Sequence, residues 1–189
     1  MKIAIAGGIG SGKSLVTRYL RELGAKVVVA DEVNAELLQD AEYIALIANN
    51  FPSVVHNNAI NKKELADIVY HNEEKRRLLM DLAHPRIFRK MFLKYPDSKI
   101  VFYEIPLLAG AEDKFDRFLY VDAPIADRLA RIVKRDNVSE EYAERIVSLQ
   151  KGEYAMLDKA TYVIFNDSSA EELQRRVKAL YCSILEQFS

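Results

Sequence analysis

The stretch IAIAGGIGSGKSLVTRYL, residues 3–20, decides how the rest of the chain is read. Residues 3–6 form a short apolar run, which predicts a buried strand. A glycine-rich turn follows, and residues 14–23 then place apolar side chains at helical spacing until Gly24 ends the pattern. A strand, a glycine turn and a helix in this order are typical of a loop that holds the phosphates of a nucleotide.

The turn itself, GGIGSGKS at residues 7–14, matches the pattern G-x-x-x-x-G-K-[ST] in full. Glycines let the backbone curl so that its N–H groups point inward, and the helix that follows adds the positive end of its dipole. Lys13 can reach the β- and γ-phosphates, and the Ser14 hydroxyl can bind Mg²⁺. The alternative, a chance match in a glycine turn, is disfavoured by the strand before it and the helix after it.

The composition of the 189 residues fits one globular domain with room for an inserted subdomain. The net charge of −1 provides no basic field for nucleic acid. No apolar run approaches the ~20 residues of a spanning helix, and no signal peptide precedes the glycine turn. The single cysteine, Cys182, is expected to be a small core residue in a reducing compartment. We therefore expect a cytoplasmic protein with a small-molecule substrate and neither nucleic acid nor membrane as partner; no pattern sets an oligomeric state.

Hydrophobic periodicity predicts five strands that alternate with helices. After the first strand, the others are expected at 27–30, 99–105, 118–121 and 162–165, with later helices at 124–135, 139–150 and 169–188. Such alternation predicts a three-layer α/β/α fold with a five-stranded, mainly parallel sheet.

Between the second and third strands the strand pattern stops and only helical patterns remain. A helix is expected to begin after Asn61, and another at 73–83 is expected to break at His84-Pro85. We therefore assign residues 1–32 and 96–189 to a nucleotide-binding core with a lid near 128–150. Residues 33–95 are assigned to an inserted helical domain over the strand ends, where open α/β sheets bind ligands.

A kinase needs an acid near the acceptor hydroxyl. Asp31 directly follows the second strand, so it could accept the acceptor's proton or orient Mg²⁺; the alternative is an N-cap of the next helix. Glu104 ends the third strand and could act on Mg²⁺ through water or cap a strand edge. The guanine-reading pattern of GTP switch proteins is absent, because the nearest string, residues 61–64, opens a helix and ends in Glu64.

A kinase also needs cations around the moving phosphoryl group. Arg128, Arg131 and Arg135 lie at i, i+3 and i+7, so one helix face is strongly basic. Arginines on a lid stabilise the transition-state charge and exclude water, which favours Arg131 and Arg135 as functional. The alternative is a solvated face paired with the glutamates of residues 140–144.

Several separate motifs together resemble the dephospho-CoA kinase family. The resemblance runs from about residue 3 to residue 180, and the order of its elements is more specific than the phosphate loop alone. The motifs are GGIGSGKS, Asp31, His84-Pro85-x-Ile87, Glu104-Ile105-Pro106-Leu107-Leu108, Arg131-x3-Arg135, Arg145-x4-Gln150 and the strand that ends at Asn166.

The resemblance implies a P-loop kinase that uses ATP and Mg²⁺ to phosphorylate the ribose 3′-hydroxyl of dephospho-CoA, the last step of CoA synthesis. It makes Asp31 the general base, with Lys13, Arg131 and Arg135 as the other catalytic residues. It places acceptor-side residues at His84, Pro106 and Leu107. It places around ATP the residues Gly8, Gly10, Ser11, Gly12, Lys13, Ser14, Leu15, Arg145 and Asn166. A P-loop kinase for a nucleoside, sugar or shikimate-like acceptor, or a non-enzymatic ATP-binding module, stays as an alternative.

Five positions depart from the family pattern. Val29 stands where a first aspartate usually precedes Asp31, and Leu15 stands where threonine usually follows the loop serine. Ala109-Gly110 replace Phe-Glu, and Thr161 replaces an aspartate. None of these changes removes Lys13, Ser14 or Asp31, but together they permit weaker activity or a shifted acceptor preference.

Overall fold

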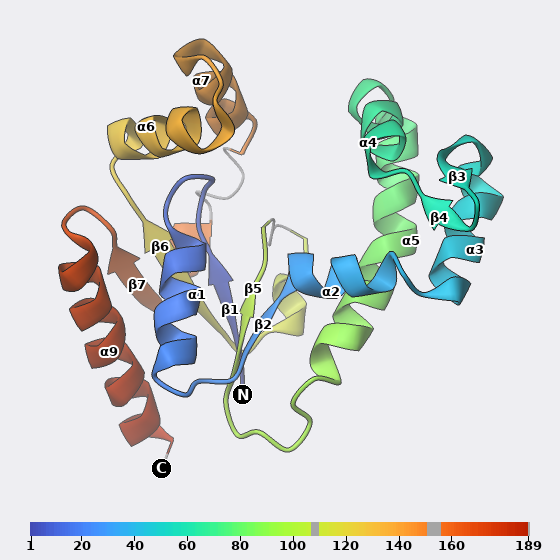
Figure 1. Cartoon of the computed structure of the whole chain (residues 1–189). Helices are drawn as coiled ribbons and strands as arrows, with labels where there is room; N and C mark the ends of the chain where they lie inside the picture. Colours follow the sequence, from blue (N-terminus) through green and yellow to red (C-terminus); the bar gives the residue numbers. More distant parts are fainter. Residues whose placement is uncertain (107–109, 151–155, 189) are drawn as a thin grey trace. The chain divides into compact units, whose positions relative to one another are not determined.

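The computed structural model describes residues 1–106, 110–150 and 156–188 (Figure 1). The chain forms two compact units. The first, which we call the core unit, comprises Met1–Val28 and Asp97–Ser189. The second, the helical unit, comprises Val29–Pro96.

A five-stranded sheet is built from β1 (Lys2–Ala6), β2 (Val27–Val29), β5 (Val101–Glu104), β6 (Arg117–Asp122) and β7 (Tyr162–Phe165). Their order is β2-β5-β1-β6-β7, and β1 runs parallel to both β5 and β6, as β6 does to β7. The register pairs Ile5 with Glu104 and with Leu119, so β5 and β1 end side by side. The predicted three-layer fold with a mainly parallel sheet is confirmed.

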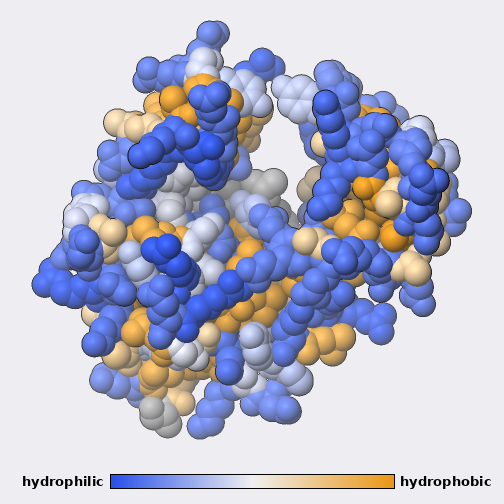
Figure 2. All heavy atoms as spheres, in the orientation of Figure 1, coloured by the Kyte–Doolittle hydropathy of each residue, from blue (hydrophilic) through white to orange (hydrophobic). Residues whose placement is uncertain are grey.

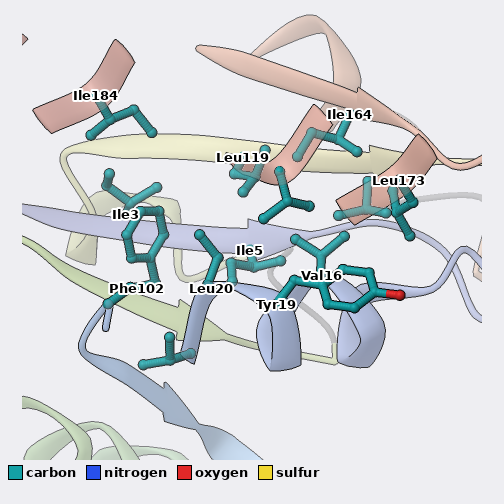
Figure 3. Packing of buried hydrophobic residues seen from close by; sticks show 14 residues of the cluster. Ile3, Ile5, Val16, Tyr19, Leu20, Phe102, Leu119, Ile164, Leu173 and Ile184 are labelled. Carbon is teal, nitrogen blue, oxygen red and sulfur yellow. The ribbon is translucent and has the colours of Figure 1, made fainter. Parts of the chain in front are cut away.

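One face of this sheet is covered by α1 (Lys13–Glu22) and α9 (Ala170–Gln187), which lie side by side (Figure 1). Figure 3 shows their apolar side chains packed onto those of the strands. Burying each large aliphatic side chain stabilises the fold by roughly 1.5–3 kcal/mol. This packing therefore fixes the position of the loop between β1 and α1. The most buried members are Ile3, Ile5, Val16, Leu20, Phe102, Leu119, Val121, Leu173, Val177 and Ile184.

A helical hairpin, α6 (Ile125–Asp136) and α7 (Glu140–Leu149), has a small core of its own. Ile132, Ala143 and Val147 are buried there, and Ile9 from the glycine loop packs against them. Asn137 ends α6 with a φ of 53°, in the left-handed region. The hairpin and the glycine loop thus share one apolar cluster. A short 3₁₀ turn, η2 (Glu112–Lys114), precedes β6.

The helical unit contains α2 (Ala30–Leu37), α3 (Ala41–Asn50), α4 (Lys62–His71) and α5 (Glu73–Phe92), with a 3₁₀ turn η1 (Pro52–Val54). It also contains a hairpin of β3 (Val55–His56) and β4 (Ala59–Ile60), so the prediction of helices alone was wrong here. Asn57 and Asn58 have φ values of 49° and 60°. Two central residues with positive φ give the tight turn that suits antiparallel strands, and asparagine tolerates that region.

The predicted helix break at His84-Pro85 was also wrong, because α5 continues through Pro85 to Phe92. Proline lacks an N–H and disturbs the turn before it, which usually ends or kinks a helix. Here the Arg86 guanidinium donates a hydrogen bond of 3.0 Å to the carbonyl of Leu82 in that turn. The carbonyl that loses its helical donor is that of Asp81, four residues before Pro85, so this bond lies one position further on and does not replace the lost one.

Cys182 was predicted to be a core residue, but it is exposed on α9. The buried stripe of that helix runs through Leu173, Val177 and Ile184, and Cys182 falls five residues beyond Val177, off the stripe. Within the described part of the chain, every helix falls short of the length and apolar character that a membrane crossing requires.

Candidate active site

The glycine loop, residues 7–12, connects β1 to α1 at the centre of the sheet. Gly10 and Gly12 have φ values of 78° and 100°, which curl the backbone at the start of α1. No side chain caps that helix, and its first turn holds no acidic residue. An uncapped helix N-terminus with inward-turned N–H groups attracts an anion, so the loop fits the phosphates of a nucleotide.

All four glycines of the loop lie against close neighbours. A Cβ at Gly8 would lie 2.1 Å from Nη2 of Arg128, and a Cβ at Gly12 would lie 2.2 Å from Nδ2 of Asn166. Real Cβ atoms do not approach heavy atoms so closely. A larger residue at either position would have to displace the side chain of Arg128 or Asn166. Gly7 and Gly10 are more strictly required, because a Cβ there would lie 2.3 Å from the carbonyl oxygen of Val121 and 2.7 Å from that of Arg128.

Arg128, on α6, is the first of these side chains. It is only 1% exposed, and its Nε donates a hydrogen bond of 2.9 Å to the carbonyl of Ile9. A buried guanidinium is costly unless it is hydrogen-bonded, so its place beside the loop indicates a structural role there. The basic face predicted for this helix is thus not a solvated face at Arg128.

Arg131 and Asn166 hold the other side of the loop. Nη1 of Arg131 lies 3.1 Å from the carbonyl oxygen of Gly10 and 3.4 Å from that of Ser11, and Nη2 donates to the carbonyl of Asn166 at 3.2 Å. The buried Asn166 amide donates to the carbonyl of Ser11 at 2.8 Å. The structure therefore brings Arg131 and Asn166 to the predicted phosphate loop. The predicted alternative for Arg131, pairing with glutamates of the next helix, does not occur; its carboxylate neighbour is Asp127 at 3.8 Å.

Gln150 also contacts the glycine loop, although the sequence analysis gave this residue no role. Its Oε1 accepts a hydrogen bond of 2.8 Å from the N–H of Ile9. The sequence signal was present, because Gln150 closes the Arg145-x4-Gln150 motif. Of that pair only Gln150 contacts the loop: Arg145 is exposed on α7 and, within the described residues, its side chain has no hydrogen-bond or ion-pair partner.

Arg135, four residues beyond Arg131, is exposed and does not reach the loop. Its Nε and Nη2 donate to the two carboxylate oxygens of the adjacent Asp136 at 2.7 and 2.8 Å. These hydrogen bonds raise the pKa of Arg135 and lower the pKa of Asp136. An exposed pair of this kind contributes little to stability, so Arg135 is available for exchange of partners.

Lys13 and Ser14, the first residues of α1, carry the polar groups of the loop's mouth. Nζ of Lys13 donates to the carbonyl of Gly7 at 2.6 Å and lies 3.3 Å from that of Gly8, so the ammonium sits over the loop. Leu15, which replaces the usual threonine, is partly buried against the core between sheet and helices. Its side chain thus packs rather than facing the loop.

Ser14 and Glu104 form a hydrogen-bonded pair. The Ser14 hydroxyl donates to Oε1 of Glu104 at 2.9 Å, and Glu104 is 7% exposed. Because β5 lies between β2 and β1, Glu104 does not cap a sheet edge. A hydroxyl and a carboxylate are oxygen ligands of the kind Mg²⁺ prefers, and Mg²⁺ usually takes only one or two protein ligands. The pair therefore fits a magnesium ion bound with nucleotide phosphates; in the described ranges no three His, Cys, Asp or Glu side chains cluster as a metal cage.

Asp31 lies in the first turn of α2, in the helical unit, and is exposed. The predicted alternative role as N-cap is wrong, because the N-cap is Val29 and no side chain bonds there. A carboxylate in the first turn is favoured by the helix dipole, but it is not needed to satisfy an N–H group. Its carboxylate is thus left exposed to solvent.

The predicted acceptor-side residues lie in both units. In the helical unit, His84 is exposed on α5, and its ring lies edge-on to that of Phe88 at a centroid distance of 6.2 Å. Desolvation lowers the pKa of the imidazole, although the Asp81 carboxylate opposes the shift, and this favours the neutral ring. In the core unit, Pro106 is exposed just after β5, and Leu107 lies outside the described residues.

Comparison with known proteins identifies relatives over nearly the whole chain. A family model described as dephospho-CoA kinase matches residues 1–172. Curated dephospho-CoA kinases from Fusobacterium nucleatum and Coxiella burnetii are 34% and 35% identical to the chain over 184 and 194 residues. The first alignment covers 94% of this chain and 95% of the relative, and the second covers 98% of each. The crystal structure of TT1252 from Thermus thermophilus is similar with a TM-score of 0.84 at 30% identity, covering 100% of this chain and 98% of that one.

Proposed function

Because the chain belongs to the dephospho-CoA kinase family, we propose that it transfers the γ-phosphoryl group of ATP to the ribose 3′-hydroxyl of dephospho-CoA. The observation that supports this most is the glycine loop with Lys13 over it and the Ser14–Glu104 pair beside it. That arrangement suits positioning and charge stabilisation, which supply most of the catalysis in phosphoryl transfer.

On the donor side, the loop backbone and the α1 N-terminus bind the phosphates of ATP, and Lys13 follows the charge that moves during transfer. Ser14 and Glu104 are the residues that would hold Mg²⁺, which when bound neutralises phosphate charge. Arg128, Asn166 and the other loop contacts keep the backbone in place. Arg131 is close enough to add positive charge at the loop.

On the acceptor side, Asp31 accepts the proton of the ribose 3′-hydroxyl while the 3′-oxygen of the ribose bonds to the γ-phosphorus and ADP leaves. This role is supported by the family resemblance, by the place of Asp31 two residues after β2, and by its freedom from helix capping. Arg135 and Arg145 would add positive charge to the transition state from the lid. His84, Pro106 and Leu107 are assigned to the acceptor side, and the exposed thiol of Cys182 suits a reducing, cytoplasmic setting.

The test is an acceptor panel. Purified protein with ATP and Mg²⁺ is expected to form ADP only when dephospho-CoA is added, and the product should be heavier by one phosphate. A nucleoside, a sugar and shikimate serve as the competing acceptors, since P-loop kinases of one fold act on many of these. ADP formed equally fast without any acceptor, or faster with another acceptor, would contradict the proposal.

Replacing Glu104 with glutamine tests the proposed magnesium site. The amide keeps the shape and can still contact Ser14, but it loses the charge that attracts the cation. We expect the Mg²⁺ concentration for half-maximal activity to rise by about tenfold or more. The same shift should appear in the binding of Mn²⁺ with ATP, measured by electron paramagnetic resonance. Glu22→Gln, on the surface of α1, is the matched control, and an unchanged metal dependence in Glu104→Gln would remove Glu104 from the site.

A further inference from the structure

The helical unit contains an apolar cavity of about 350 Å³ between α2, α4 and α5, which we call the α2–α4–α5 cavity. All of its lining residues belong to this unit, and Figure 2 shows apolar residues gathered at the surface of the unit among hydrophilic ones. Small-molecule sites are concavities of about 300–1,000 Å³ with mainly apolar walls, so the size and character fit a bound ligand. The walls are formed chiefly by Leu38, Tyr43, Leu65, Val69, Met80 and Ile87.

A few polar groups also border this cavity: Asn34, Lys62 and His84. The Asn34 amide and the neutral His84 imidazole can each donate and accept hydrogen bonds. Lys62 is exposed, which keeps its charge in contact with water. The interior therefore favours an uncharged group that is mostly hydrocarbon and has a small number of amide-like polar atoms.

A second cavity of the same unit, of about 490 Å³, differs in charge. Tyr43 borders both cavities, so the two are neighbours. Strongly polar side chains line the second one: Asp40, Glu42, Arg86, Arg89 and Lys90. Of the two, the α2–α4–α5 cavity is thus the one unsuited to a pyrophosphate and suited to a neutral ligand.

We propose that the α2–α4–α5 cavity binds the pantetheine arm of dephospho-CoA. This inference rests on the proposed function. The arm is uncharged and consists of methylene and methyl groups with a hydroxyl, two amides and a terminal thiol. The apolar walls match its hydrocarbon, and Asn34 and His84 match its amides. Met80, 40% exposed at the wall, is a flexible side chain that can adjust to such an irregular chain.

Filling the cavity tests the proposal. Ala66 lines it from α4 and is exposed, so Ala66→Phe places a ring in the cavity without entering the buried core. We expect KM for dephospho-CoA to rise about tenfold while KM for ATP and kcat at saturating acceptor stay the same. Met80→Trp fills the cavity from α5 and should act alike. Lys63→Phe, also on α4 but outside the lining, is the matched control, and thermal unfolding checks that each variant is folded.

Pantetheine alone provides a second measurement. Calorimetry should detect its binding to the wild-type protein and to Lys63→Phe, but at least about tenfold weaker binding to Ala66→Phe. Equal pantetheine binding and an equal KM for dephospho-CoA in wild type and Ala66→Phe would overturn the cavity assignment. If the wild type did not phosphorylate dephospho-CoA at all, the proposed function would fail, and the calorimetry would still decide what the cavity binds.

Discussion

Replacing Lys13 with methionine is expected to lower kcat/KM for ATP by about a thousandfold, the scale seen when one preorganised donor to transition-state charge is removed. Methionine keeps most of the length of the side chain but loses the ammonium, which now lies over the carbonyls of Gly7 and Gly8. Because charge shifts along the phosphates during transfer, the ammonium stabilises the transition state more than bound ATP. Steady-state kinetics with dephospho-CoA measures the loss, and calorimetry measures ATP binding separately.

The binding of ATP to Lys13→Met should weaken much less than kcat/KM falls. Lys178→Met, on the exposed face of α9, is the control for loss of one lysine and should leave both quantities unchanged. A decrease of less than about threefold in kcat/KM would mean that the Lys13 ammonium does not stabilise the charge of the transition state.

Replacing Asp31 with asparagine should lower kcat by about a thousandfold, within the range that a general base contributes. Asparagine has nearly the same shape but cannot accept the proton of the 3′-hydroxyl at neutral pH. Because Asp31 does not cap α2, the substitution removes only a favourable interaction with the helix dipole, about 0.3–1 kcal/mol. Single-turnover rates are the appropriate measurement, since they isolate the chemical step from product release.

Glu32→Gln is a closely matched control, because Glu32 is the other acid in the first turn of α2. It should lose a similar amount of stability and keep its kcat. Unfolding midpoints that are alike in the two variants, with kcat lost only in Asp31→Asn, would support the base. Equal kcat values in wild type and Asp31→Asn would exclude Asp31 from proton transfer.

The parts of the fold that local patterns specify could be predicted from the sequence. The five strands and the glycine loop follow from short apolar runs and a fixed motif, and they were placed correctly. Errors arose where a local rule has exceptions or a pattern is too short to read. The α5 helix continues through Pro85 although proline usually ends or kinks a helix, and the β3–β4 hairpin was missed because each of its strands is only two residues long.

The site shows the same division. Lys13 and Ser14 are fixed by the motif. Arg131, predicted as a lid arginine, donates a hydrogen bond to the carbonyl of Gly10 in the loop, and its catalytic role stays a prediction. For Arg128 the pattern predicted only a basic helix face, either functional or solvated, because its partner Ile9 lies 119 residues away in the sequence. Only the folded structure shows that this arginine is buried. Arg135, predicted from helical spacing, and Arg145, predicted from the family resemblance, are exposed, and their catalytic roles stay predictions.

The side chains of Arg128, Arg131 and Gln150 hold main-chain atoms of the glycine loop, and Ile9 packs inside the α6–α7 hairpin. The loop and the first half of α6 are therefore mechanically a single body: neither can swing without breaking several hydrogen bonds at once. Gln150 follows α7 directly, so the far end of the hairpin is tied to the loop as well. A substitution on the surface of α6 that lowers the local stability of this helix should consequently also weaken the binding of nucleotide phosphates by the loop.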